Sequence, residues 1–165
     1  MEVDLNAAVV RVQPTLTTSA YQAGECIGGL QTVSGLVDET NGTGTLLSLT
    51  VIDKKNLSVP IDICFYSQNP SGSTMTDNAA ISMLAADHAS YFLGRISVAA
   101  GDYATQALGT NLKDATKLPG SCGLKLKSTG GNGKIYVVLV ATTTASGSWA
   151  AGAGDLTIVL GVDQD

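Results

Sequence analysis

His88 is the one histidine in this chain of 165 residues, and its neighbours are of the types that take part in nucleophilic catalysis. Asp87 precedes it, and Ser90 follows two positions later. A serine nucleophile passes its proton to a histidine that a carboxylate orients, so this grouping prompts the question of a hydrolase. Residues this close on a helix point in different directions, however, and cannot align as a relay. We interpret His88 as a surface or helix-end histidine and predict no catalytic residues.

The cysteines do not form a metal-binding pattern. Cys26, Cys64 and Cys122 are odd in number, far apart, and in no C-x-x-C spacing. One histidine with scattered cysteines cannot supply a zinc site, and the acidic residues form no calcium loop. We predict reduced cysteines, no metal and no cofactor. Cys122 shares strand parity with Leu124 and Leu126, so we expect it to be a small buried hydrophobe.

The segment Ser128 to Lys134 contains glycines and a lysine, as phosphate-binding loops do. A Walker A loop needs a glycine where Ser128 stands and a serine or threonine where Ile135 stands. The segment also lies between two predicted strands rather than before a helix. We therefore interpret Gly130 to Gly133 as a hairpin turn.

Two other kinds of binding site receive little support. Sugar sites favour exposed aromatic platforms, but aromatic residues make up only 5% of the chain. The net charge is -5, whereas phosphate affinity requires clustered cations, so we exclude nucleic-acid binding. We place the three lysines near the Gly-rich turn on the solvated side of a hairpin, and the five tyrosines mainly in the core or at its rim. These residues are Lys125, Lys127 and Lys134, and Tyr21, Tyr66, Tyr91, Tyr103 and Tyr136.

The composition indicates one domain with a weakly charged surface. Hydrophobic residues make up 44%, enough for a core, and charged residues only 14%, against about 25% in typical soluble domains. Glu2 and Asp4 stand where a secretion signal would be basic, and no apolar run approaches the ~20 residues of a membrane helix. We expect a soluble protein made in the cytoplasm, with residues 1–165 as one domain and Met1 to Leu5 as a flexible arm.

Alternating apolar and polar residues predict that the domain is all-β. A period of two means one buried face and one exposed face. The run Ile135 to Ala141 is apolar on both faces and predicts a central strand, covered outside by a loop, by the helix or by a neighbouring molecule. The alternating apolar positions are Val10 and Val12; Leu47, Leu49 and Val51; Val59, Ile61, Ile63 and Phe65; Leu124 and Leu126; and Leu156, Ile158, Leu160 and Val162.

Glycine-rich turns between many short strands favour an antiparallel β-sandwich of jelly-roll type. One short helix is expected from about Asn78 to Ala89. Asp77 is its predicted N-cap, because a carboxylate there accepts hydrogen bonds from the free amides of the first turn.

The order of segments resembles a family of small structural proteins of tailed-phage virions. The alternating strand that includes Ile63 runs into Asn69-Pro70-Ser71-Gly72, then Thr74 to Ala80, and later Leu93-Gly94 opens a strand. The resemblance covers most of the chain. Its other parts are Pro14 to Tyr21, Gly24 to Gly29, Leu46 to Asp53 and Asp155 to Gln164.

This resemblance implies a non-enzymatic protein of the virion that binds and stabilises the assembled capsid as a decoration, or cement, protein. Its implied partners are the major capsid protein and further copies of itself in a homotrimer, with no nucleic acid and no membrane. Two alternatives remain open. One is a receptor- or glycan-binding module of a fibre; the other is a glycan hydrolase, which would need two carboxylates roughly 5 to 10 Å apart.

Overall fold

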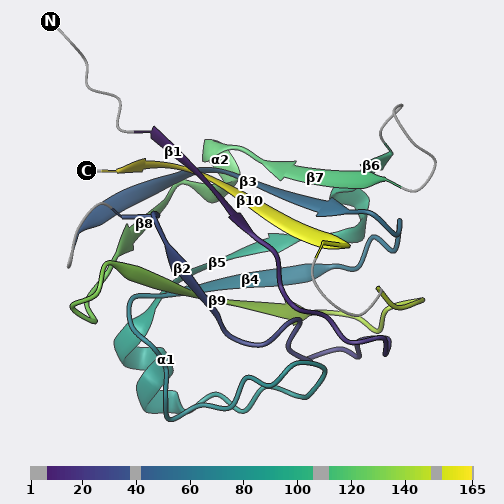
Figure 1. The fold of residues 1–165 in the computed structure, drawn as a ribbon, viewed down its shortest axis with the longest axis horizontal. Coiled ribbons are helices and arrows are strands. Elements are labelled where there is room, and N and C mark those ends of the chain that lie inside the picture. Colours follow the sequence, from purple (N-terminus) through teal and green to yellow (C-terminus); the bar gives the residue numbers. More distant parts are fainter. Residues whose placement is uncertain (1–6, 38–41, 106–111, 150–153, 165) are drawn as a thin grey trace, which may run out of the picture.

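The computed structural model describes residues 7–37, 42–105, 112–149 and 154–164, which form two antiparallel sheets packed face to face (Figure 1). The predicted arm, Met1 to Leu5, lies outside the described residues. The larger sheet contains β1 (Ala7–Val12), β10 (Leu156–Gln164), β3 (Thr43–Asp53), β7 (Lys113–Lys117) and β6 (Ala104–Thr105) in that order, and β8 (Leu124–Lys127) also pairs with β3. The smaller sheet contains β2 (Gln31–Ser34), β9 (Lys134–Ala141), β4 (Ile61–Tyr66) and β5 (Phe92–Val98) in that order.

The chain winds between the sheets as a jelly roll does. Strands β1 to β4 alternate between the larger and the smaller sheet, β4 and β5 form a pair, and the chain then passes through β6, β7 and β8 to β9 and β10. Strands β7 and β8 pair with different halves of β3, and the helical turn α2 (Pro119–Cys122) joins them. The predicted all-β, jelly-roll-like sandwich is confirmed.

The predicted alternation holds in β4, β8 and β10, where the named apolar residues lie between the sheets, and it fails at one position in β3. Leu46, Leu49 and Val51 are buried, whereas Leu47 is exposed. The pairing of β3 with β10 shifts at this point, because Ser48 faces Gly161 but Leu46 faces the next residue. Leu47 is therefore the extra residue of a β-bulge, which reverses the parity of the strand.

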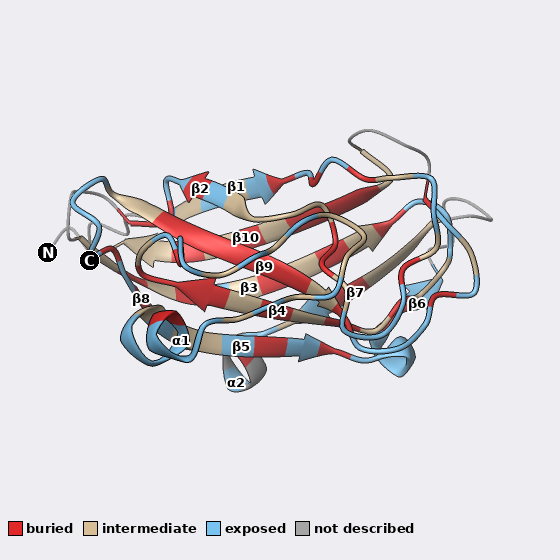
Figure 2. Ribbon diagram, turned by 90° about the horizontal axis from the view of Figure 1, so that it is seen from below, coloured by how far each residue is buried: buried red, intermediate tan, exposed pale blue. Residues whose placement is uncertain are grey.

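The expected central strand is β9, which lies between β2 and β4. Its inner face joins the core, and its outer face is covered by residues 67–91, the connection from β4 to β5. We call this connection the cover segment. Figure 2 shows it in front of the smaller sheet. It buries a second apolar cluster, so a loop and helix cover this face. The cluster comprises Cys26, Tyr66, Tyr136 and Val138, with Leu30, Cys64, Met75, Ile81, Met83, Tyr91 and Val140 packed against it.

The helix in the cover segment is shorter than predicted. The expected range was Asn78 to Ala89, but α1 spans Ala85–Tyr91, and its N-cap, Leu84, makes no side-chain capping bond. Asn78 has φ 55°, a left-handed conformation that a right-handed helix cannot contain. The one-helix expectation holds, but the predicted start is wrong.

Asp77 is not the helix cap but a latch that holds the cover segment to the rest of the sandwich. Its carboxylate accepts a hydrogen bond from the Tyr21 hydroxyl at 2.7 Å and another from the Gly28 amide. The backbone at Asp77 also forms a bridge with Cys26. The Asp77 carboxylate was predicted to accept hydrogen bonds from the first turn of a helix, but it accepts them from Tyr21 and Gly28 instead.

The Gly-rich segment 130–133 is not a hairpin turn. Strand β8 belongs to the larger sheet and β9 to the smaller one, so the segment crosses between sheets. Lys125 and Lys127 are exposed on β8, whereas Lys134 is half-buried on the other sheet. The three lysines therefore do not share one hairpin face.

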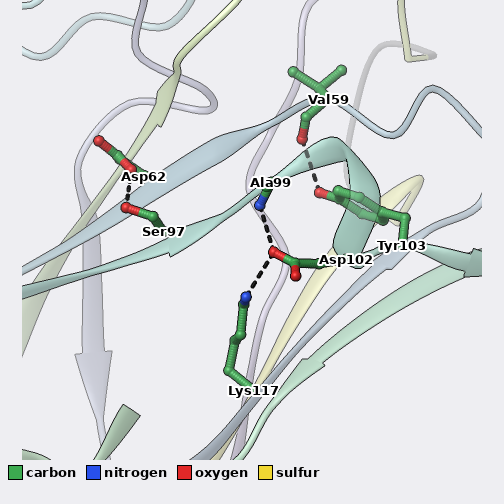
Figure 3. A network of polar contacts seen from close by, with 7 residues as sticks. All are labelled: Val59, Asp62, Ser97, Ala99, Asp102, Tyr103 and Lys117. Atoms are coloured by element: carbon green, nitrogen blue, oxygen red, sulfur yellow. Dashed lines mark hydrogen bonds and ion pairs between the residues drawn. The ribbon is translucent and has the colours of Figure 1, made fainter. Parts of the chain in front are cut away.

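A polar network fastens the passage from β5 to β7 (Figure 3). The 3₁₀ turn η1 (Ala100–Asp102) ends in a carboxylate that accepts from the Ala99 amide at 2.7 Å and pairs with the Lys117 ammonium at 2.6 Å. The hydrogen bond from Lys117 is the main cause that lowers the pKa of Asp102 below its usual value. The Tyr103 hydroxyl donates to the Val59 carbonyl at 2.9 Å, which ties the turn to the start of β4.

Replacing Asp77 by alanine removes the acceptor of two hydrogen bonds. We expect it to lower the free energy of unfolding by about 2 kcal/mol, because stranded donors cost about 1–3 kcal/mol. Asp163→Ala, at a half-buried site near the end of β10, is the control and should change it by less than about 0.5 kcal/mol. Urea denaturation measures both, and equal losses in the two variants would contradict the latch.

Candidate functional site

The residues around His88 do not form a catalytic relay. The Asp87 carboxylate is buried and accepts from the Ser73 hydroxyl at 2.8 Å. The His88 Nδ1 atom lies 3.2 Å from the Tyr66 hydroxyl, and its ring stacks on Phe92 with centroids 4.3 Å apart. The two residues that a relay would join therefore bond to different partners, Ser73 and Tyr66.

The three cysteines are free. Cys26 and Cys122 are buried, and Cys122 lies at the end of α2 with its Sγ 3.3 Å from the Leu47 carbonyl oxygen. Its burial is confirmed, although its position is in a helical turn rather than a strand. Burial raises the pKa of the Cys26 thiol to about 12, and burial followed by the Asp62 charge raises that of Cys64 to about 11. Both are therefore weak nucleophiles near neutral pH.

The other candidate sites from the sequence also find no support in geometry. Within the ranges that the structure describes, no three His, Cys, Asp or Glu residues gather where they could hold a metal ion.

The Asn132 carboxamide accepts from the Lys134 amide at 3.0 Å and donates to the Tyr136 hydroxyl at 3.1 Å, so it stabilises the crossover between sheets at residues 130–133. Four tyrosines are buried and Tyr91 is half-buried, so the expected core and rim placement holds. The four are Tyr21, Tyr66, Tyr103 and Tyr136.

The outer face of the larger sheet has an unusual composition. Side chains that point away from the core in β1, β10, β3 and β7 line up in rows across the strands. One row contains Arg11, Val159, Thr50 and Thr116, which are successive pairing partners. We call this surface the open face. Its members are Val9, Gly161 and Ser48; Arg11, Val159, Thr50 and Thr116; and Gln13, Thr157, Ile52 and Asp114.

Charge is scarce on the open face. The three rows contain Arg11 and Asp114 as charged members, and β-branched residues occupy most of their other positions. The next row of the same face, paired through Thr45, adds Asp163 and Lys125. Val9 is 63% exposed. A sheet face bathed in water normally alternates polar residues outward, so outward valine and isoleucine indicate a contact surface. No connection comparable to the cover segment lies over it in the described chain (Figure 1).

A pocket of about 270 Å³ opens on the other side of the molecule, between the smaller sheet and the cover segment. The outward residues of β4 and β9 form its floor, two side chains of the cover segment form one wall, and a histidine and an arginine stand at its rim. The lining residues are Asp62, Cys64, Tyr66, Val138, Val140, Ile81, Met83, His88 and Arg95.

The polar groups of the pocket satisfy one another. Arg95 pairs with Asp62 at 3.1 Å, and the Ser97 hydroxyl donates to the same carboxylate at 2.6 Å. At the other end, the Tyr66 hydroxyl is bonded to His88. Desolvation by burial is the main cause that raises the pKa of Tyr66 to about 12, so its phenol is neutral at physiological pH. The middle of the pocket is apolar.

Comparisons with known proteins assign no family. No family model matches the chain, and no curated protein matches it. A solved structure similar to it is CorA, a surface-associated copper-binding protein important in copper acquisition by Methylomicrobium album BG8. CorA has a TM-score of 0.34 and 11% identity, over 99% of this chain and 95% of that one.

Two viral structures are also similar. That of the Desmodium yellow mottle tymovirus has a TM-score of 0.28 and 12% identity, over 98% of this chain and 88% of that one. VP2 of infectious bursal disease virus, in a subviral particle, has a TM-score of 0.25 and 15% identity, over 94% of this chain and 40% of that one. At such TM-scores these likenesses transfer no ligand, partner or activity to this protein.

Neither the open face nor the pocket was predicted as a site. The outward valines and threonines of β1, β3 and β10 were visible as a parity pattern in the sequence, and this signal could have identified the open face. The pocket joins residues from 62 to 140 in the chain and has no local signal.

Among the helices of the described ranges, none has the length and apolar character to span a bilayer.

The raised pKa of Cys64 has a kinetic consequence. At pH 8 a thiol with a pKa of about 11 is about 0.1% thiolate, so iodoacetamide should label Cys64 on the order of 100-fold more slowly than an ordinary cysteine. The rate should rise about tenfold per pH unit up to pH 10, because the thiolate is the reacting species.

Peptide mass spectrometry follows each cysteine separately, and Cys26 and Cys122 are internal controls that should react only after unfolding. Intact mass without reductant should show three free thiols. Labelling of Cys64 at pH 8 as fast as in the urea-unfolded protein would contradict the prediction.

Proposed function

We propose that this protein is a structural component of a tailed-phage virion that binds the assembled capsid shell as a decoration protein. The open face is its contact surface in this proposal. The observation that carries it is the set of outward β-branched residues in the middle of the larger sheet, on a face over which the described chain places no connection like the cover segment. The order of sequence motifs and the jelly-roll winding agree with this role.

A flat sheet face suits a partner that is itself an extended surface. Binding energy then comes from many small apolar and polar contacts rather than from one deep anchor, and no catalytic group is needed. A protein that binds the assembled shell more tightly than its free subunits stabilises the shell by mass action. Shell lattices present repeated equivalent sites around three-fold axes, so a homotrimer is the proposed bound form.

The glycan-binding alternative is less well supported. It requires exposed aromatic platforms, but four tyrosines are buried and Trp149 is 1% exposed. The aromatic side chain that is most accessible in the described part, Phe92, stacks on His88 rather than standing alone.

A single charge placed in the open face should weaken attachment to the shell. We expect Val159→Lys to reduce binding to stripped, expanded capsids of the parent phage at least tenfold, because an unpaired ammonium would be dehydrated in the contact. Ser90→Lys adds the same charge on exposed α1, on the opposite side of the sandwich, and should bind like the parent protein. Co-sedimentation measures all three.

Equal pelleting of both variants would contradict the assignment of the open face. Failure of the parent protein to pellet with capsids, combined with pelleting with host envelopes, would contradict the decoration role and favour receptor binding.

Salt and assembly state provide a second test. Raising the salt concentration from 50 to 500 mM should change capsid binding by less than about threefold, because apolar contacts are little screened.

Light scattering of the protein, either alone or bound to released shell fragments, should show trimers. A monomer at high concentration, with no three-fold density on decorated particles, would contradict the trimer.

A further inference from the structure

We propose that the pocket beneath the cover segment is a binding site for a neutral, mainly apolar small molecule with two fused rings. It lies on the opposite side of the sandwich from the open face and plays no part in the proposed shell contact. The proposal therefore stands or falls separately from the decoration role.

The shape of the pocket follows from how the cover segment rests on the smaller sheet. Outward side chains of β9, Val138 and Val140, form the floor with Cys64 of β4. Ile81 and Met83 of the cover segment line the opposite wall and pack against the apolar cluster. Small-molecule sites are usually concave and mainly apolar with a few polar groups at fixed positions, as here.

The size of the pocket sets the size of the ligand. A cavity of about 150 Å³ lined by apolar side chains accommodates benzene. The volume here, about 270 Å³, is larger than one ring requires and lies just under the range of drug-sized pockets. A fused bicyclic molecule fits this volume better than a single ring or a large cofactor.

The charges of the rim favour a neutral ligand. Arg95 and Asp62 neutralise each other, and the second oxygen of Asp62 is occupied by Ser97. An anion would compete with Asp62 for the guanidinium, and a cation would compete with Arg95 for the carboxylate. The pair has no net charge, so neither kind of ion gains a net electrostatic attraction that offsets the loss of its hydration in an apolar pocket. A neutral ring keeps both existing pairs.

The Tyr66 hydroxyl provides the directional contact. It lies 3.2 Å from His88 Nδ1 and 3.9 Å from the Met83 sulfur, so its position is held from two sides. A hydroxyl has one donor and two acceptor sites, so Tyr66 retains capacity for one polar group on the ligand. A bicyclic ring with a single hydroxyl or N–H group meets these requirements.

Three probes with one ring system and different charges test this chemistry. We expect 2-naphthol, which is neutral at pH 7, to bind at least tenfold more tightly than 2-naphthoate or 2-naphthylmethylammonium, as measured by calorimetry. Methyl NMR should place the 2-naphthol at Ile81, Val138 and Val140, with no shift at Val159. Absence of binding, equal affinity for a charged probe, or shifts confined to Val159 would overturn the proposal.

Two matched variants locate the site. Val140→Trp fills the pocket and should weaken 2-naphthol binding at least tenfold, whereas Val159→Trp, at a half-buried valine on the open face, should leave it unchanged. Unchanged binding to Val140→Trp would overturn the site. If that variant does not fold, the NMR shifts of the parent protein decide the question. Capsid binding should show the reverse dependence on these two positions, so failure of one proposal is distinguishable from failure of the other.

Discussion

The rest of the structure depends on a strand that must be buried on both faces. Strand β9 carries apolar residues inward and outward, and the sandwich itself covers one side only. The second cover must come from elsewhere in the chain, and residues 67–91 provide it. This requirement explains why the connection between two hairpin-paired strands is long, why it contains methionine, isoleucine and tyrosine, and why a carboxylate fastens it at Asp77. A short turn between β4 and β5 would leave Val138 and Val140 in water.

The sandwich and many of its buried residues could be predicted from the sequence, because a two-residue period depends on local spacing alone. The errors arose where a distant contact outweighed a local rule. Asp77 has the character of a helix cap, but Tyr21 and Gly28 offer its carboxylate partners from far along the chain. The alternation in β3 predicts that Leu47 is buried, but the bulge in the pairing with β10 leaves it exposed. The Gly-rich segment before β9 looks like a hairpin, since nothing local reveals that its two strands belong to different sheets.

The two outer faces of the sandwich differ in what covers them. The sequence contains a local pattern for the open face but none for the pocket. The open face takes its residues from alternate positions of β1, β3 and β10, which is a pattern within reach of sequence analysis. The pocket lies between β9 and the side chains of Ile81 and Met83, so it depends on how segments more than 50 residues apart pack together. Spacing along the chain contains no information about such a pocket.

The chemistry of the open face explains how an uncovered apolar surface remains compatible with water and yet ready for contact. Its threonines bond to one another or to a neighbour: the hydroxyls of Thr50 and Thr116 lie 2.9 Å apart, and Gln13 donates to Thr157 at 3.3 Å. Groups that are already paired across strands lose little when water leaves, whereas a lysine or glutamate would lose its hydration. The surface can therefore be dehydrated over a wide area at low cost. In the proposed shell contact, Arg11 and Asp114 lie on opposite flanks of this surface, and charges at the edge of a contact favour one register over others more than they add affinity.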